Sequence, residues 1–195
     1  MTDEMVEPIE DEDDRSGDGG GGSALRTALE WVVLIACALL VAFVVKTFIF
    51  QAFYIPSESM VPTLEVGDRV LVNKLSYRLH DPHRFDIVVF TAPKGTETAD
   101  IKDLVKRVVG LPGETIEGRD GNIYIDGRLI NEPFLPPGTR SRTFGPVKIP
   151  PHEYFMLGDN RQFSKDSTYF GPIERSTMVG RVFVRIWPLN RLGRL

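Results

Sequence analysis

Two short segments, one with two serines and the other with a lysine, have the residue types that hydrolytic catalysis requires. Residues 55–64 read IPSESMVPTL and place Ser57 and Ser59 on a turn bounded by prolines. Residues 106–114 read KRVVGLPGE and begin with Lys106 in an apolar, strand-like run. A serine is a weak nucleophile until a neighbouring base takes its proton, and a lysine can be that base where no histidine serves. The two segments therefore predict nucleophilic catalysis by a serine.

A lysine base has to be neutral near pH 7. Its pKa in water is about 10.4, and full burial lowers that value by up to about 3–5 units. If residues 104–109 form a strand, Lys106 shares a face with Leu104 and Val108, and Arg107 points the opposite way. An ordinary surface lysine on an edge strand fits the same pattern, so the pattern alone leaves both interpretations open.

The three histidines offer no clear alternative base. His80 and His83 lie in the polar stretch HDPH, and His152 follows two prolines. The first two could hold a metal, although exposed loop positions explain them more simply. We find no candidate Ser-His-Asp set, and we expect neither a metal nor a cofactor.

Charge and cysteine content exclude several classes of protein. Residues 1–26 contain nine acids and two arginines, whereas the rest has 18 acids against 21 lysines and arginines. The resulting net charge of +3 over residues 27–195 is too small for a nucleic-acid-binding protein, and the sequence contains no motif of that class. Cys37 is the only cysteine, which excludes an intrachain disulfide and a cysteine-based metal site.

The N-terminal part predicts a tail and a membrane anchor. Residues 1–26 are acidic and glycine-rich, which predicts a disordered cytoplasmic tail, either a spacer or a docking segment. Residues 27–50 form the predicted anchor, because Trp31–Phe50 supplies the twenty residues that a membrane helix needs once Lys46 snorkels. A cleaved signal peptide would begin with basic residues, and a buried globular helix would have a polar face.

Basic residues near the anchor predict its orientation. Arg15 and Arg26 precede it, while residues 51–68 contain no lysine or arginine. The positive-inside rule then places the N-terminus in the cytoplasm and the remaining chain outside. Ser59 follows Phe50 by nine residues, so it lies within about 30 Å of the membrane boundary.

The rest of the chain predicts a mainly β, barrel-like domain of antiparallel sheet over residues 51–195. Short β-branched and aromatic runs separated by glycine and proline are typical of strands. Asp126-Gly127 is a favoured two-residue hairpin turn, and we expect a hairpin insertion over about residues 115–150. The predicted strands are 69–74, 86–90, 104–109 and 179–187, with a hairpin at 122–130.

Several segments in order resemble the bacterial type I signal peptidases, a family of membrane-anchored serine proteases. They follow the predicted anchor and span the chain to about residue 187. They are residues 56–64 with Gly67-Asp68, residues 86–90, residues 106–114, and residues 158–167, which read GDNRQFSKDS.

The resemblance implies roles for individual residues. Ser59 would be the nucleophile and Lys106 the general base. The Ser57 hydroxyl and the Ser59 backbone N–H would form the oxyanion hole, and Ser164 would orient the lysine amine by a hydrogen bond. The structural supports implied for this site are Asp159, Asn160 and Arg161.

The resemblance also implies a substrate and a location. The substrates would be preproteins with signal peptides cut after a small-x-small motif, at the bacterial cytoplasmic membrane. The lipid bilayer would be a partner, and the secretion machinery is a further candidate. The residues that we expect to line the substrate cleft are Ile55, Ile87, Val88 and Val89.

Three positions depart from the family's usual residues. Glu58 and Phe85 stand where glycine is common, and Thr168 stands where an arginine commonly pairs with the acid at Asp166.

Two other interpretations of the chain's function compete with the signal peptidase. One is a self-cleaving, repressor-type Ser-Lys protease, against which the anchor argues; the other is a membrane-tethered β-domain that binds exported or cell-wall components without catalysis.

Overall fold

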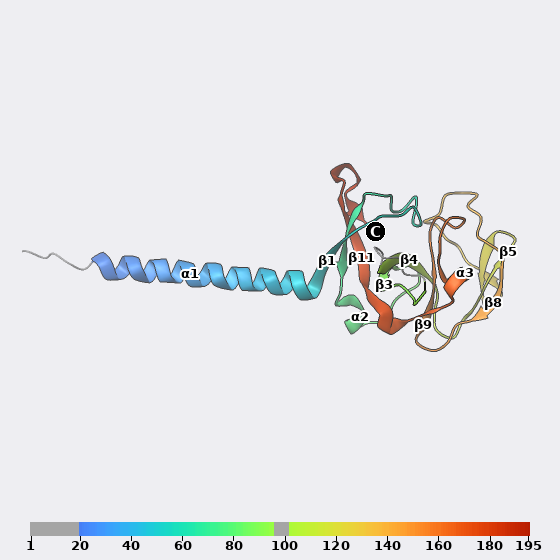
Figure 1. Ribbon diagram of the computed structural model, residues 1–195, viewed down its shortest axis with the longest axis horizontal. Coiled ribbons are helices and arrows are strands. Elements are labelled where there is room, and N and C mark those ends of the chain that lie inside the picture. Colours follow the sequence, from blue (N-terminus) through green and yellow to red (C-terminus); the bar gives the residue numbers. More distant parts are fainter. Residues whose placement is uncertain (1–19, 96–101) are drawn as a thin grey trace, which may run out of the picture. The chain divides into compact units, whose positions relative to one another are not determined.

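The computed structural model describes residues 20–95 and 102–195. The chain divides into two units between Phe43 and Val44, and the second unit runs from Val44 to Leu195. Helix α1 runs over Gly20–Val44 and is followed by a π-helical turn, Val45–Ile49 (Figure 1). Within it, Arg26–Val44 is long and apolar enough to cross a membrane. An apolar helix therefore precedes the β-rich part of the chain, as the sequence predicts.

The ends of this helix differ from the predicted boundaries. It begins at Gly20, so residues 20–26 are helical although we predicted them as tail. Ala, Leu and Arg at 24–26 favour helix, which lets the helix extend past the predicted boundary. Phe50, predicted as the last anchor residue, begins a strand. The predicted disorder of residues 1–19 concerns residues outside the described part of the chain.

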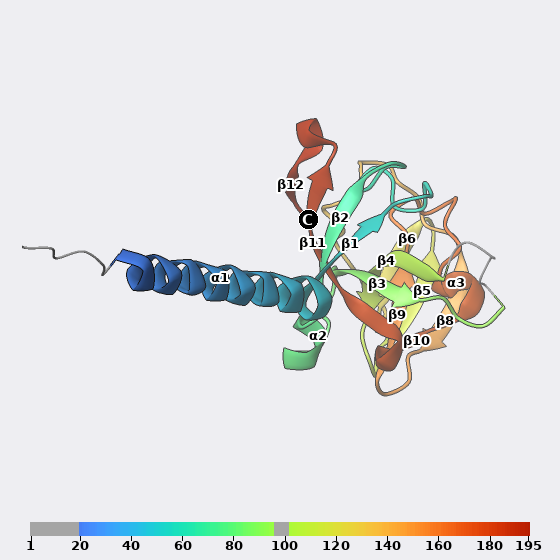
Figure 2. The same ribbon diagram turned by 60° about the vertical axis from the view of Figure 1, so that its left-hand side comes forward.

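The second unit is built on one large antiparallel sheet (Figure 2). Its strands follow the order β1 (Phe50–Tyr54), β2 (Arg69–Asn73), β11 (Met178–Trp187), β3 (Ile87–Thr91), β4 (Asp103–Gly110), β9 (Glu153–Leu157) and β10 (Ile173–Glu174), with β12 (Gly193–Arg194) paired to β11. All four predicted single strands are present within one residue of their predicted ends. The predicted mainly β fold is confirmed.

A smaller sheet of four strands lies between β4 and β9 in the sequence. Its order is β7 (Arg128–Leu129), β6 (Asn122–Ile125), β5 (Thr115–Arg119) and β8 (Phe144–Lys148). The predicted hairpin is confirmed by the pairs Tyr124–Leu129 and Ile125–Arg128. Asp126 and Gly127 have φ angles of 49° and 75°, the left-handed conformation that a type I′ turn requires.

Three apolar clusters hold the sheets together. The larger sheet curls, so β2 and β3 contribute Val70, Val72, Ile87 and Val89 to one cluster, together with Met60 and Leu64. The opposite face of β3 and β4 carries a second cluster. The third cluster joins the two sheets, with Ile116 and Ile123 from one and Phe155 and Leu157 from the other.

Two short α-helices and two 3₁₀ helices, Arg175–Thr177 and Leu189–Arg191, complete the described part of the chain. Helix α2 covers Ser76–Leu79, and helix α3 covers Ser167–Phe170. Asp166 caps α3 by accepting a hydrogen bond from the Thr168 N–H. This cap fixes the segment that follows Ser164, one of the predicted site residues.

Candidate active site

A closed loop holds Ser59 beside the large sheet. Two backbone hydrogen bonds join the loop's ends, from Ile55 N–H to Asp68 O and from Gly67 N–H to Ile55 O, at 2.9 and 3.0 Å. Met60 and Leu64 anchor its middle, since their side chains are 1% and 0% exposed. The serine is therefore presented from a loop that is held at both ends and at its centre.

Lys106 on β4 reaches this serine across 47 positions of sequence. Its Nζ lies 2.5 Å from Ser59 Oγ, which is hydrogen-bond distance. The lysine is 3% exposed, and this burial lowers its pKa to about 8, against the opposing attraction of Asp166 and Asp159. Roughly a tenth of the amine is therefore neutral at pH 7 and half at pH 8, and the neutral form is the one that a general base requires.

Ser57 lies close to the same Ser59 hydroxyl. Its Oγ is 3.3 Å from Ser59 Oγ, and its side chain is exposed to solvent. A hydroxyl in this position can donate to an oxygen that develops negative charge on a carbonyl attacked by Ser59. The geometry is compatible with the oxyanion role predicted for Ser57.

A cleft of about 540 Å³ opens at Ser59 and Lys106. Ile55 lines it, as predicted, whereas Ile87, Val88 and Val89 do not, and that part of the prediction is wrong. These three residues are at most 3% exposed and belong to the apolar clusters, because β3 lies in the middle of the sheet. The cleft is lined by Phe53, Tyr54, Ile55, Pro56, Ser57, Ser59, Met60, Lys102, Asp103, Leu104, Val105 and Lys106.

The part of β4 that borders the cleft has one open edge. Strand β3 pairs with residues 103–107 of β4, whereas β9 pairs only with residues 107–110. Within the described ranges, 20–95 and 102–195, no strand covers the second edge of residues 103–106. Unpaired backbone groups on such an edge can accept an extended peptide as a further strand.

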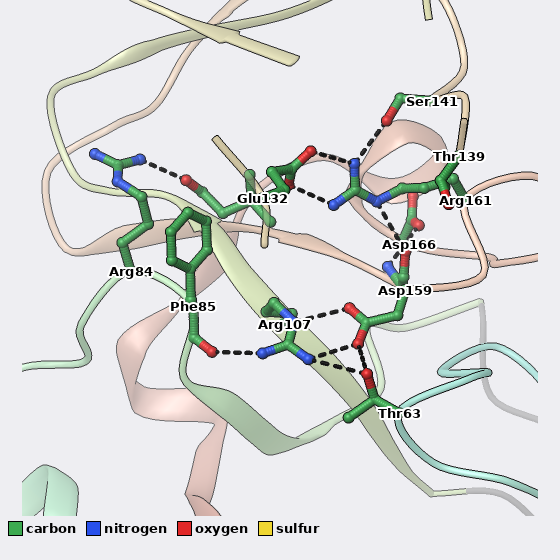
Figure 3. Close-up of polar contacts among 12 residues, drawn as sticks. Thr63, Arg84, Phe85, Arg107, Glu132, Thr139, Ser141, Asp159, Arg161 and Asp166 are labelled. Atoms are coloured by element: carbon green, nitrogen blue, oxygen red, sulfur yellow. Dashed lines mark hydrogen bonds and ion pairs between the residues drawn. The ribbon is translucent and has the colours of Figure 1, made fainter. Parts of the chain in front are cut away.

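Arg107, next to Lys106 on β4, forms a buried ion pair with Asp159 (Figure 3). Arg107 donates from Nε and Nη2 to the two Asp159 oxygens at 2.8 and 2.5 Å, and from Nη1 to Phe85 O at 2.9 Å. Thr63 Oγ1 donates to the same carboxylate at 2.5 Å. The pair thus connects the lysine strand, the serine loop and the segment after β9, which is the support predicted for Asp159.

Asn160 and Arg161 tie the same segment to its surroundings. Asn160 donates from its backbone N–H to Ser59 O and from Nδ2 to Glu58 O, both at 3.1 Å. Arg161 is 4% exposed and binds both carboxylate oxygens of Glu132, as Figure 3 shows. Their predicted role as supports therefore corresponds to direct contacts with the serine loop and with the loop before β8.

Ser164 does not make the hydrogen bond predicted for it. Its Oγ is buried and has no partner within the described part of the chain. The hydroxyl lies against Gly158 instead: a Cβ added to Gly158 would fall 2.2 Å from Ser164 Oγ and 2.4 Å from Ser59 O. Gly158 thus belongs to the site, and the sequence marked it only as the first residue of its segment.

Phe85, one of the three departures, adopts a φ of 75°, where glycine is least strained. Its carbonyl oxygen accepts the hydrogen bond from Arg107, and its ring packs on that of Phe134 with centroids 5.0 Å apart. The bulky residue therefore keeps the backbone geometry that a glycine would provide.

The histidines do not join this site. The rings of His80 and His83 lie 5.2 Å apart, centroid to centroid. Over residues 20–95 and 102–195 the structure contains no group of three His, Cys, Asp or Glu side chains that could hold a metal ion.

Comparison with known proteins gives a consistent result. Residues 28–187 match the family model described as signal peptidase, peptidase S26. A probable signal peptidase I-2 of Synechocystis sp. is 42% identical over 173 residues, which cover 87% of this chain and 78% of that protein. The signal peptidase I of Bacillus caldolyticus is 37% identical over 169 residues, covering 80% and 90%. A crystal structure of a signal peptidase I from Enterococcus faecalis has a TM-score of 0.44 and 32% identity, covering 52% of this chain and 97% of that one.

Proposed function

Because the chain belongs to the signal peptidase family, peptidase S26, we propose that it is a membrane-anchored endopeptidase that removes N-terminal signal peptides from exported preproteins. The observation that carries the proposal is the 2.5 Å contact between Lys106 Nζ and Ser59 Oγ at the wall of a cleft. A neutral, buried amine at that distance can take the serine proton as the hydroxyl attacks.

The reaction proceeds through an acyl-enzyme. Ser59 Oγ attacks the scissile carbonyl while Lys106 accepts its proton, and the oxyanion is bound by the Ser59 N–H and the Ser57 hydroxyl. The ammonium then returns a proton to the leaving amine, which departs as the N-terminus of the mature protein. A water molecule, deprotonated by Lys106, releases the signal peptide and restores the serine. Each oxyanion donor is worth about 10²–10³-fold in rate.

The open edge of β4 favours an extended substrate. A peptide that pairs with residues 103–106 would run between that edge and the segment that begins at Phe53, past Ser59. Alternate side chains of an extended peptide face the same wall, so the residues at −1 and −3 would both point into the cleft. Ile55 and Val105 on this wall favour small side chains there, which suits cleavage after a small-x-small motif.

The apolar helix supports a membrane anchor. Arg26–Val44 has the length and composition of a span, and Phe50 opens the catalytic unit shortly after it. With the arginines before the span, the N-terminus lies in the cytoplasm and the catalytic unit faces outward. The chain then meets its substrate near the bilayer surface, where the end of a signal peptide's apolar segment emerges. The secretion machinery is a candidate partner there.

Two substitutions test the dyad in the full chain solubilised in detergent. We expect Ser59→Ala and Lys106→Met each to lower the cleavage rate of a preprotein by roughly 10⁴–10⁶-fold, because each removes a member of a unit that acts together. Ser176→Ala and Lys148→Met, both at exposed positions, are the matched controls and should cleave like the parent chain. Substantial cleavage by either dyad variant would refute the assignment. Binding without cleavage by the unaltered chain would favour the non-catalytic β-domain instead.

A further inference from the structure

Two buried carboxylates on the segment after β9 attract the Lys106 ammonium, but their own partners differ. Asp159 and Asp166 are 2% and 1% exposed. Asp159 is paired with the Arg107 guanidinium through both oxygens. Its negative charge is therefore largely cancelled before it acts on the lysine.

Asp166 accepts hydrogen bonds from neutral donors only. Its Oδ2 accepts from the Gly158 N–H at 3.0 Å, and its Oδ1 accepts from the Thr168 N–H at 3.1 Å and from Thr168 Oγ1 at 2.7 Å. Within residues 20–95 and 102–195 no lysine, arginine or histidine forms an ion pair with it. The three hydrogen bonds stabilise a carboxylate without cancelling its charge.

A short series of contacts leads from Asp166 to the dyad. The Gly158 N–H binds Asp166, and the same glycine packs against Ser59 O and Ser164 Oγ. Ser59 Oγ in turn lies 2.5 Å from Lys106 Nζ. Asp166, Ser164 and Lys106 are all buried, and charges inside the protein interact more strongly than they do in water.

We propose that Asp166 is a positioning residue that acts on Lys106 through its charge. Its unpaired negative charge stabilises the protonated form of Lys106 and so sets the pH above which the enzyme works. Thr168 does not neutralise the Asp166 carboxylate, because its side chain is an uncharged hydroxyl. A cationic side chain at position 168 would neutralise it. The inference rests on the proposed function, in which Lys106 is the base.

The electrostatics around Lys106 agree with this assignment. Burial lowers its pKa to about 8, and Asp166, ahead of Asp159, acts to raise it. Lys102 and Asp103 at the cleft have opposite signs and oppose one another. The nearby guanidinium of Arg107 is paired with Asp159. That of Arg161 is paired with Glu132 and donates to Gly158 O rather than to Asp166. Asp166 is therefore the charge whose removal should change the protonation of Lys106 most.

The test compares the pH dependence of preprotein cleavage by the full chain and three variants. Thr168→Arg keeps Asp166 and adds a cation at its carboxylate, and Asp166→Asn removes the charge. We expect both to move the acid limb of kcat/KM to lower pH by about one unit. One unit below the parent's limb, each variant should then retain several-fold more of its own maximal rate. Thr168→Val, which removes only the hydroxyl and leaves the charge uncancelled, should keep the limb in place.

A second readout does not depend on activity. Isocyanic acid adds to neutral amines, so the pH at which Lys106 is half-maximally carbamylated reports its protonation by mass spectrometry. We expect the same downward displacement in Thr168→Arg and Asp166→Asn. The proposal would be overturned if both variants kept the parent's acid limb of kcat/KM and the parent's pH of half-maximal carbamylation and lost only maximal rate. Asp166 would then have a purely structural role. If the parent chain failed to cleave at all, the proposed function would fall, while the carbamylation profile would still decide the role of Asp166.

Discussion

Gly158→Ala is the most direct test of how tightly the site is packed. A Cβ at this position would lie 2.4 Å from Ser59 O and 2.2 Å from Ser164 Oγ, whereas Cβ contacts under 3.0 Å are essentially never observed. The Ser59 carbonyl must therefore retreat by roughly 0.6 Å, and the serine moves with it. Because a misplacement of about 1 Å can cost about 10²-fold in rate, we expect kcat to fall roughly 10- to 100-fold.

Two other glycines provide controls, and none of the three has a positive φ, so only steric effects differ. Gly145 has nothing within 4 Å of an added Cβ, and Gly145→Ala should leave both stability and kcat nearly unchanged. At Gly110 the added Cβ would meet Ile149 Cδ1 at 2.3 Å and Phe155 Cβ at 2.9 Å in the apolar core. Gly110→Ala should lower the free energy of unfolding by about 1–3 kcal/mol, with little loss of kcat among folded molecules.

The assay measures initial rates of preprotein cleavage in detergent at saturating substrate, with guanidinium unfolding of the same samples. We expect Gly158→Ala and Gly110→Ala to lose comparable stability, but only Gly158→Ala to lose kcat substantially. A Gly158→Ala chain with the parent's kcat would refute the close packing of the glycine against Ser59. Equal loss of kcat in both variants would show that the effect is general destabilisation.

Two further predictions concern stability. Lys106 has a folded pKa of about 8 and an unfolded pKa of 10.5, so the unfolded chain binds more protons between these values and stability rises with pH there, by up to about 3 kcal/mol. Lys106→Met should therefore be more stable than the parent below pH 8, and this difference in unfolding free energy should shrink toward pH 10. Guanidinium titrations at several pH values measure it. A difference that does not change with pH would contradict the energetic cost assigned to burying the Lys106 ammonium. Asp159→Ala leaves Arg107, whose side chain is 7% exposed, without its carboxylate and should cost about 3–5 kcal/mol of unfolding free energy. The control, Glu117→Ala, breaks a more exposed pair and should cost at most about 1 kcal/mol, and a similar cost for both would contradict the argument.

The sequence alone determined the local elements and indicated the residues of the proposed dyad. The apolar run of the anchor, the β-branched runs and the Asp126-Gly127 turn each depend on neighbours within a few residues, and the structure contains all of them. Ser59 and Lys106 stood out because their residue types and flanking segments resemble a family of Ser-Lys proteases. Local pattern could not distinguish a base from a surface lysine, since burial is not a property of a short segment.

Tertiary structure decided how these elements surround the site. The order of strands buries Ile87, Val88 and Val89 and opens the cleft along Phe53 and Leu104 instead, because pairing between distant strands fixes which faces meet. Two further features depend on close approach of segments far apart in the chain: Gly158 against Ser59, and the bidentate Arg107–Asp159 pair. Such contacts arise only when the sheet curls, so no pattern within one segment encodes them.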